Sequence, residues 1–531
     1  MSNTNKITFF LLILLIHPLS IFSVELNELT QTKLIKSLLE NNLEIKYQKY
    51  SLKIASKFVQ KEQAIFESTL TASLNHKNNH TPNTAEQFFD RMYKEDFHER
   101  VTSYQAGVKK LLPTGTLVGF DVIIDDIDND LVAQKYQDKL DKESSSNINF
   151  SINQPLLKNF GTESTNAKIL MAKCSKNMAN QEYKNNLINI VSDALSAYWE
   201  LYYTTRQYEL YKDSLQIAQG LLITNSEMVK EGRMAESELI NLKADLRIRN
   251  SLLNAAKQKL IASQNRIYSL SGMPHRHSDI DFIPIDKPDY TKVEKILNDN
   301  SILKNSFMNN PKYISGLMQL RQLNIQIAYL KNQKLPDLNL KANFSINSLD
   351  NRPEDFIENI FNDNHESWSL GLEFKMPLGG GLSMESEFAI ANLKKQQTLV
   401  RLRTIEVDLE NQITTNLKSL YYISKQLANN EENVFFKQKL MDIESKKLEI
   451  GKSNTQNLLE KEKELNQAKN SRLRAEVNLE LSIIELKKIE GVLLENYGII
   501  IEKDNLKLLG KMKQEITKRY NSYILKTKDK K

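Results

Sequence analysis

The sequence predicts a mainly α-helical protein with a membrane β-barrel, built from two internal repeats of strand pairs and long coiled helices. Three observations predict this class. Two long spans contain no proline, one between Pro155 and Pro274 and one after Pro377. Short segments alternate strictly between apolar and polar residues, as "NINFSIN" does at 147–153. Both kinds of segment recur in the second half of the chain, which predicts one structural unit used twice.

Composition excludes several classes of protein. The chain has 531 residues, of which 40% are hydrophobic and 26% are charged, and its formal net charge is +6. So small an apolar share argues against a bundle of membrane-spanning helices. Acidic and basic residues are interspersed, which is typical of solvated helix faces. No basic stripe with interleaved aromatic residues stands out, so we expect no nucleic-acid binding.

The N-terminus has the three-part pattern of a signal peptide. "MSNTNK" carries one Lys, "ITFFLLILLI" is apolar, and "HPLSIFS" ends in small residues. We expect residues 1–23 to be a signal peptide cleaved near Ser23; an uncleaved anchor is the alternative. No Cys follows the apolar run, and Cys174 is the one Cys in the chain, so no lipoprotein acceptor and no intrachain disulfide are expected. This favours a periplasmic or outer-membrane protein.

The spans without proline predict very long helices. We expect helices over 164–231 and 383–450, each followed by a return helix, at 233–271 and 452–490. In the second long span the apolar residues from Leu402 to Leu427 recur with a mean step of about 3.6, the α-helical period. At 1.5 Å per residue each long helix would extend roughly 100 Å.

Shorter helices are expected just before the first strand of each repeat, at 43–66 and 312–335. Stacked end to end with a return helix, each nearly matches a long helix in length. The segments 272–311 and 492–531 would then lie at the joint.

The second half of the chain repeats the first. Gly232 and Gly451 lie 219 positions apart, as do Gly272 and Gly491. We expect a first structural repeat over 24–286, a second over 287–500 and a basic C-terminal tail over 501–531.

Four alternating segments predict strands, two in each repeat, near 68–75, 147–154, 337–347 and 367–377. A half-buried soluble sheet would alternate in the same way. However, Lys341, Glu373 and Lys375 join Asn and Ser on the polar face, and Trp368 ends an apolar face. Apolar-out, polar-in strands of about ten residues are typical of a membrane barrel. Open sheet edges cannot face lipid, so these strands must close with strands of other chains.

A further hairpin is expected over 103–124, around Pro113, Thr114 and Gly115. It is either an external loop or an added part of the barrel wall.

Several motifs together resemble the TolC family of outer-membrane efflux proteins. They are "INQPLLKNFG", "FKMPLGGGLS", "YLKNQKLPDLNLKANFSIN", "KEGRMAESEL", "EIGKSNTQNLL", "LSGM" and "IEGV", in an order that covers the mature chain to about residue 500. The resemblance implies a homotrimeric α/β-barrel conduit: a twelve-stranded β-barrel in the outer membrane, continued by an α-barrel into the periplasm. It implies export of small molecules or proteins, as in multidrug efflux or type I secretion.

The resemblance also implies partners. These are outer-membrane lipid, a periplasmic adaptor (membrane fusion) protein, and an inner-membrane pump of the RND, ABC or MFS class. The adaptor would contact the two helix-to-helix turns; plain structural turns are the alternative. The turn residues are Gly232, Arg233, Met234, Ala235, Gly451, Lys452, Ser453 and Asn454.

In the resembling family the periplasmic end of the channel narrows to a ring of acidic residues just beyond these turns. The matching positions are Glu238, Asn457 and Glu460, with Asn457 standing where the family usually has an acid. A ring of Glu460 carboxylates would favour cations. The alternative is that Glu238 and Glu460 are ordinary surface residues. We expect the "EKEKE" run at 460–464 to form a solvated helix face.

No motif predicts enzymatic chemistry. "PLGGGLS" lacks the Gly-Lys-Ser/Thr of a phosphate loop, and no Ser–His–acid grouping stands out. His275, His277 and Asp279 have metal-ligand chemistry but lie in a linker punctuated by proline. We therefore expect no catalytic residue, no cofactor, no metal and no enzyme. The competing function is a trimeric coiled-coil surface protein, adhesin-like, with a barrel anchor, although a stalk needs no second pair of strands.

Overall fold

The computed structural model describes residues 28–91, 93–130, 143–272, 282–350, 365–378, 381–499 and 514–523. The signal-peptide residues 1–23 and the trio His275, His277 and Asp279 lie outside these ranges. The chain divides into two compact units. The helical unit comprises Met1–Asn42, Ile190–Asn298 and Leu417–Glu485, and the sheet unit comprises Leu43–Asn189, Asp299–Asn416 and Leu486–Lys531.

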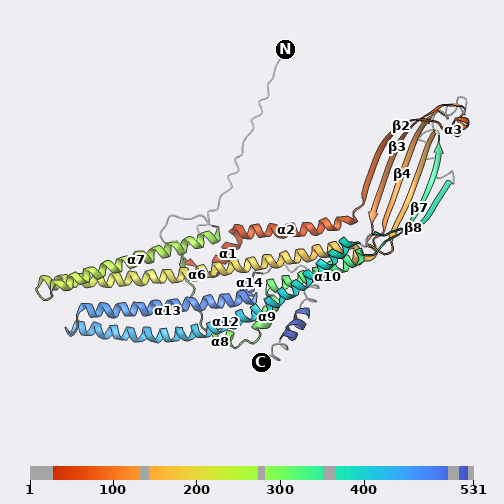
Figure 1. Ribbon diagram of the computed structural model, residues 1–531. Coiled ribbons are helices and arrows are strands. Elements are labelled where there is room, and N and C mark those ends of the chain that lie inside the picture. The colour runs from red at the N-terminus through yellow and green to blue at the C-terminus, as the bar shows by residue number, and fades with distance from the viewer. Residues whose placement is uncertain are drawn as a thin grey trace, which may run out of the picture. The chain divides into compact units, whose positions relative to one another are not determined.

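The sheet unit contains one antiparallel sheet of six strands in the described residues. Their order is β2-β3-β4-β5-β7-β8, which Figure 1 shows side by side. The bounds are β2 Thr69–Pro82, β3 Asp96–Leu111, β4 Leu117–Asn129, β5 Glu143–Pro155, β7 Asp337–Asp350 and β8 His365–Lys375. Each strand is long enough to cross a bilayer, which takes about 9–11 residues.

The hairpin predicted over 103–124 belongs to this sheet. It consists of β3 and β4, and it is paired with β2 on one side and β5 on the other. It is therefore not an external loop, and the prediction of four strands, two per repeat, was too low for this chain. The count of twelve strands for three copies, which assumes four per chain, does not fit either.

Strand register separates the sheet into an apolar and a polar face. One cross-strand row on the first face is apolar throughout: Leu70, Val108, Phe120, Phe150, Phe344 and Trp368. The neighbouring row on the other face is small or polar: Thr71, Gly107, Asp121, Asn149, Ser345 and Ser367. On the polar face, Lys341 Nζ also pairs with a Glu373 carboxylate oxygen at 2.8 Å.

Four long helices make up most of the other residues that the structure describes. They are α6 Ala167–Lys230, α7 Glu236–Ser271, α12 Leu382–Glu449 and α13 Thr455–Glu490. Figure 1 shows α7 returning along α6 and α13 returning along α12. The first long helix starts later than expected, because Asn166 separates the short helix α5 Gly161–Thr165 from α6. Within the described residues, no helix combines the length and the apolar content needed to cross a membrane.

Short elements complete each unit. The helical unit holds α1 Gln31–Asn41, α8 Thr291–Leu297 and a small parallel sheet of β1 Glu28–Leu29 with β6 Ile283–Pro284. The sheet unit holds α2 Leu43–Gln63, η1 Ala64–Phe66, α3 Ala85–Asp90, α9 Ile302–Asn309, α10 Pro311–Gln333 and α14 Leu493–Asn496.

The repeated glycines explain how a return helix ends. Gly272 and Gly491 both adopt positive φ, +67° and +76°, which favours glycine. A Cβ on Gly272 would lie 2.9 Å from the Asn41 carbonyl oxygen, and one on Gly491 would lie 2.5 Å from that of Asn309. The asparagine that follows each of these carbonyl residues also binds the end of the return helix. Asn42 Nδ2 donates to the Leu270 carbonyl at 2.7 Å, and Asn310 Nδ2 donates to the Ile489 carbonyl at 3.2 Å. The same joint is thus built once in each unit.

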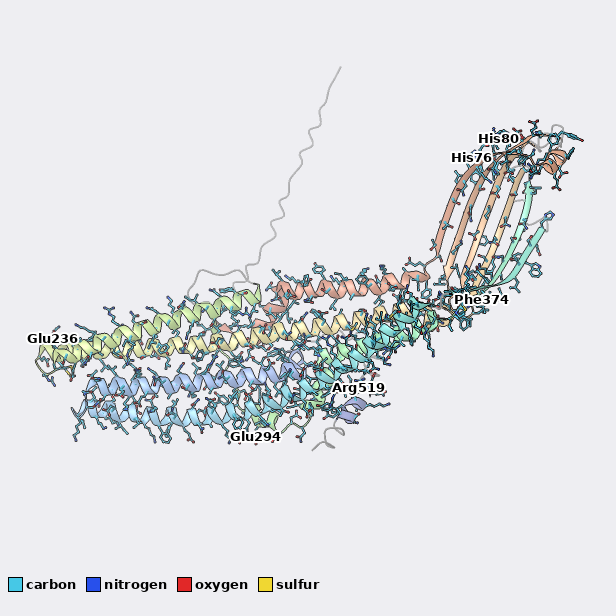
Figure 2. All side chains as sticks on the ribbon, viewed as in Figure 1. His76, His80, Glu236, Glu294, Phe374 and Arg519 are labelled. Carbon is cyan, nitrogen blue, oxygen red and sulfur yellow. The ribbon has the colours of Figure 1, made fainter. Side chains whose placement is uncertain are left out.

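Part of the C-terminal tail is ordered on the sheet unit. Residues 514–523 form a helix whose Tyr520 and Tyr523 rings lie 5.5 and 5.6 Å from the Phe307 ring. Arg519 (labelled in Figure 2) lies 3.9 Å from the Glu406 carboxylate on α12. This segment of the tail therefore packs on α9 and α12.

Candidate functional site: the helix tips and the groove between α7 and α13

Both helix tips end in the same hydrogen-bonded turn. Gly232 has φ +71° and Gly451 has φ +72°. At the first tip the amide of Arg233 donates to the Met228 carbonyl at 2.8 Å, and at the second the amide of Lys452 donates to that of Lys447 at 2.8 Å. Each glycine amide also donates to the carbonyl three residues earlier at 3.0 Å. This is the Schellman arrangement, which needs a left-handed residue at the glycine position.

The helices that leave the tips begin differently. Ala235 caps α7 without a side-chain hydrogen bond. At the start of α13, Asn454 Oδ1 accepts the Asn457 amide at 2.9 Å, as an N-cap does. Thr455 is buried there, and its hydroxyl oxygen accepts a hydrogen bond from Asn225 Nδ2 of α6 at 2.9 Å. The second tip is therefore tied to the first hairpin.

Most of the tip residues are exposed on this chain. Met234 and Ser453 are half-buried, and the others are accessible: Gly232, Arg233, Ala235, Gly451, Lys452 and Asn454. Figure 2 shows Glu236, the first residue of α7, at this end of the helical unit. The surface available to a partner is thus polar and carries two basic residues.

A groove of about 450 Å³ runs between the first turns of α7 and α13. Glu238 and Asp245 line it from α7, and Glu460 and Lys463 line it from α13. The structure thus brings Glu238 and Glu460, more than two hundred residues apart in sequence, to one groove. Asn457 is exposed but does not line it. Three carboxylates and one ammonium leave the groove with a negative charge.

The floor of the groove is apolar. Ala218 of α6, Leu242 of α7 and Leu459 of α13 are buried against one another. These contacts join the two hairpins and fix the rotation of both helices, so that Glu238 and Glu460 face outward.

A buried ionic network lies next to this floor. Arg249 of α7 and Glu462 of α13 pair directly, with side chains only 7% and 3% exposed. Arg249 Nε also bonds Asp245 Oδ2 at 2.5 Å, and its guanidinium donates to the Ser214 hydroxyl of α6. Burial by itself lowers the pKa of Arg249, but the hydrogen bonds to Asp245 and Glu462 together raise that pKa above its ordinary value. The network locks α6, α7 and α13 together, and it includes Asp245, one of the carboxylates that line the groove.

The expectation that residues 460–464 form a solvated face is wrong for Glu462. Its side chain points inward because Leu458 and Leu465, four residues before and three after it, share its buried helix face. That spacing was visible in the sequence. The partner Arg249 was not, because no local pattern tells a buried Arg from an exposed one.

Comparisons with known proteins give a family match for part of the chain. Residues 303–492 match the outer membrane efflux protein family. No curated protein matches the sequence.

Solved structures of outer-membrane channels share the fold of this chain. The outer-membrane channel OprN matches with a TM-score of 0.62 at 13% identity, over 87% of this chain and 89% of that chain. CmeC of Campylobacter jejuni matches with a TM-score of 0.59 at 15% identity, over 92% and 89%. The open-state channel MtrE of Neisseria gonorrhoeae matches with a TM-score of 0.56 at 14% identity, over 87% and 89%. The resemblance to the TolC family and the predicted fold class are thereby confirmed.

The location predicted from the sequence, the outer membrane, agrees with the description of the family matched over residues 303–492.

Proposed function

We propose that this efflux protein forms a homotrimeric channel that carries small molecules or proteins across the outer membrane, supplied by a periplasmic adaptor and an inner-membrane pump. The proposal assigns no enzymatic activity. The observation that carries it is the six-stranded sheet, which has one apolar and one polar face and two edges.

The sheet of one chain is incomplete by itself. In the described residues, β2 and β8 each pair on one side only. On β8 the apolar side chains are exposed, with Trp368 at 78% and Leu372 at 68%. Unpaired backbone groups cannot face lipid, and single-chain membrane barrels use about eight strands or more. Six strands therefore need strands from other copies.

The resemblance to the family, rather than the single chain, supports three copies. Three copies of a six-stranded sheet would supply eighteen strands. Barrels of about 16–18 strands enclose a water-filled channel. The polar rows of Thr, Asn, Ser and Asp would line that channel, and the aromatic row would face lipid.

The helices also have a surface suited to another copy. On α2 the buried side chains Ile45 and Val59 mark one face. The opposite face exposes an apolar stripe at helical spacing: Leu43, Tyr47, Tyr50, Ile54 and Phe58. Such a stripe on a two-sided helix supports packing against a neighbouring protomer in an α-barrel.

The tips and the groove would serve the periplasmic end. The exposed residues around Gly232 and Gly451 would meet the adaptor, and Glu238 and Glu460 would form the constriction.

Single-channel recording tests the proposal. The full chain is purified in detergent, its mass is measured, and the trimer is inserted into planar bilayers. We expect discrete, long-lived conductance steps from trimer fractions. A trimer that inserts but does not conduct would overturn the channel and support the adhesin-like structural protein instead.

A further inference from the structure

The strand ends of the β2–β3 hairpin bring together three side chains with metal-ligand chemistry. His80 of β2 is the register partner of His98 of β3, and Asp96 lies two residues before His98 on the same face. One ligand atom from each of the three lies within 4.8 Å of the other two. His80 Nε2 and Asp96 Oδ2 are 2.8 Å apart, and the two imidazole rings stack with centroids 3.7 Å apart.

The backbone beneath these side chains is held from both sides. Asn83 Nδ2 donates to the carbonyls of Lys94 and Asp96, at 3.0 and 3.2 Å, which closes the connection between the strands. On the other side the amide of His98 donates to Asp130 Oδ2 at 3.0 Å. The three ligand positions therefore do not depend on a loose loop.

We propose that His80, Asp96 and His98 bind a divalent transition metal ion, with Zn²⁺ as the preferred ion. Two imidazole nitrogens and one carboxylate oxygen are the ligands that Zn²⁺ accepts at about 2.0–2.2 Å. At those bond lengths tetrahedral ligand atoms lie about 3.3 Å apart, within the spacing found here. Three protein ligands leave one position open to water, as the exposure of all three side chains requires.

The surrounding charges do not oppose a cation. Arg100, one step along the same face, lies 3.7 Å from the Asp128 carboxylate. Lys94 lies 3.9 Å from that of Asp130. These two cations therefore each have an acidic partner. Arg91 donates to Asn83 Oδ1 and lies over the ring of Phe97, whose place in the strand register puts it on the other face of the sheet. The bound ion would join β2 to β3 at the end of the hairpin where α3 connects them.

The chain offers a matched control. His76 lies four residues before His80 on the same face of β2, and its Nδ1 contacts the Thr102 hydroxyl at 3.0 Å. It is not part of the cluster. Figure 2 shows both histidines on β2, with His80 nearer to α3.

The test is Zn²⁺ titration of the full chain, purified without a polyhistidine tag and stripped with a chelator. We expect one tightly bound Zn²⁺ per chain. Changes in outer-shell partners weaken metal sites about 10–100-fold, so loss of a ligand in His80→Asn, Asp96→Asn or His98→Asn should weaken binding by at least about tenfold. His76→Asn should leave binding unchanged.

A second control variant addresses two other histidines of the chain. His275→Asn with His277→Asn removes the other histidine pair of the sequence and should also leave binding unchanged. Zinc-free circular dichroism checks that every variant folds. The proposal is overturned if no Zn²⁺ binds, if the three ligand variants bind like the original chain, or if binding is lost in the His275/His277 variant. In the first case the cluster is a stacked histidine pair with an ion pair and nothing more.

Discussion

At the scale of single residues, Arg249 is the group on which the arrangement of the groove depends most. It is buried with Glu462, and removing one partner of a buried pair leaves an unpaired charge. We expect Arg249→Met to lower the free energy of unfolding by about 3–5 kcal/mol. Thermal or urea unfolding followed by circular dichroism measures this. The exposed Arg247→Met is the control, and equal effects of the two changes would contradict the structure.

Glu480 gives the helical unit a pH dependence. Burial raises the pKa of Glu480 above its ordinary value of 4.5, although the Asp289 amide, which donates to it at 2.9 Å, lowers that pKa in part. The folded chain therefore binds this proton more tightly than the unfolded chain does. Stability is lost as pH rises from 4.5 through the folded pKa.

Replacement of the Glu480 carboxyl should remove its contribution to the pH dependence of stability. We expect Glu480→Gln to raise the midpoint of thermal unfolding at neutral pH, because the amide keeps an acceptor for Asp289 and carries no charge. The gain should vanish near pH 4.5, where the unfolded carboxyl is itself half-protonated. The exposed Glu294→Gln serves as control. A gain that does not change with pH would show that Glu480 is not the titrating group.

The candidate site was only partly predictable from residues. Counting from the tip glycines along the pattern of the resembling family gave Glu238 and Glu460, which the structure brings to one groove; their role as a gate stays a prediction. It also gave Asn457, which the structure leaves outside the groove. Arg249 and the His80, Asp96 and His98 cluster were missed, because each depends on contacts between separate elements. Alternation along β2 indicates that its two histidines share a face. Only the pairing of β2 with β3 shows that His80 lies opposite His98.

At the scale of elements, proline and glycine located the long helices because these residues break helices for local steric reasons. The strands were harder to predict. In β4, "DVIIDDIDN" puts Ile123 and Ile127 on the polar face and Asp126 and Asp128 on the apolar face. Alternation is therefore blurred at that end of the strand, and pairing with β3 and β5 decides its place.

The glycines that end the return helices, Gly272 and Gly491, allow a test of the joint. Gly491→Ala forces positive φ on alanine and places its Cβ 2.5 Å from the Asn309 carbonyl oxygen. We expect a loss of more than about 1 kcal/mol in the free energy of unfolding. Gly220→Ala, inside α6 with no atom within 4 Å of the new Cβ, should instead gain about 0.5–1 kcal/mol. The same sign for both substitutions would argue against the joint.

At the scale of the whole molecule, the groove carboxylates should control ion selectivity. Three copies of Glu460 near one axis would favour cations. We expect Glu460→Ala trimers in planar bilayers to show weaker cation selectivity and weaker block by trivalent cations. Glu432→Ala, on the exposed surface of α12, should change neither. Unchanged selectivity and block in Glu460→Ala would return Glu460 to an ordinary surface role.

The central claim is that β8 of one copy pairs with β2 of the next until three copies close the wall. Cysteine cross-linking tests it most directly, in a chain whose own buried Cys174 is first changed to Ser. Single cysteines are placed pairwise on the polar faces of β2 and β8, around Ser73 and Ser369, to scan the register. Neighbouring strands bring Cα atoms to about 4.5–5.5 Å, within disulfide range.

The account predicts that at least one pair gives covalent dimers and trimers on oxidation, with no larger species. Exclusively monomeric products, whether cross-linked within one chain or not at all, would contradict it, as would a ladder that ends at two copies or continues beyond three.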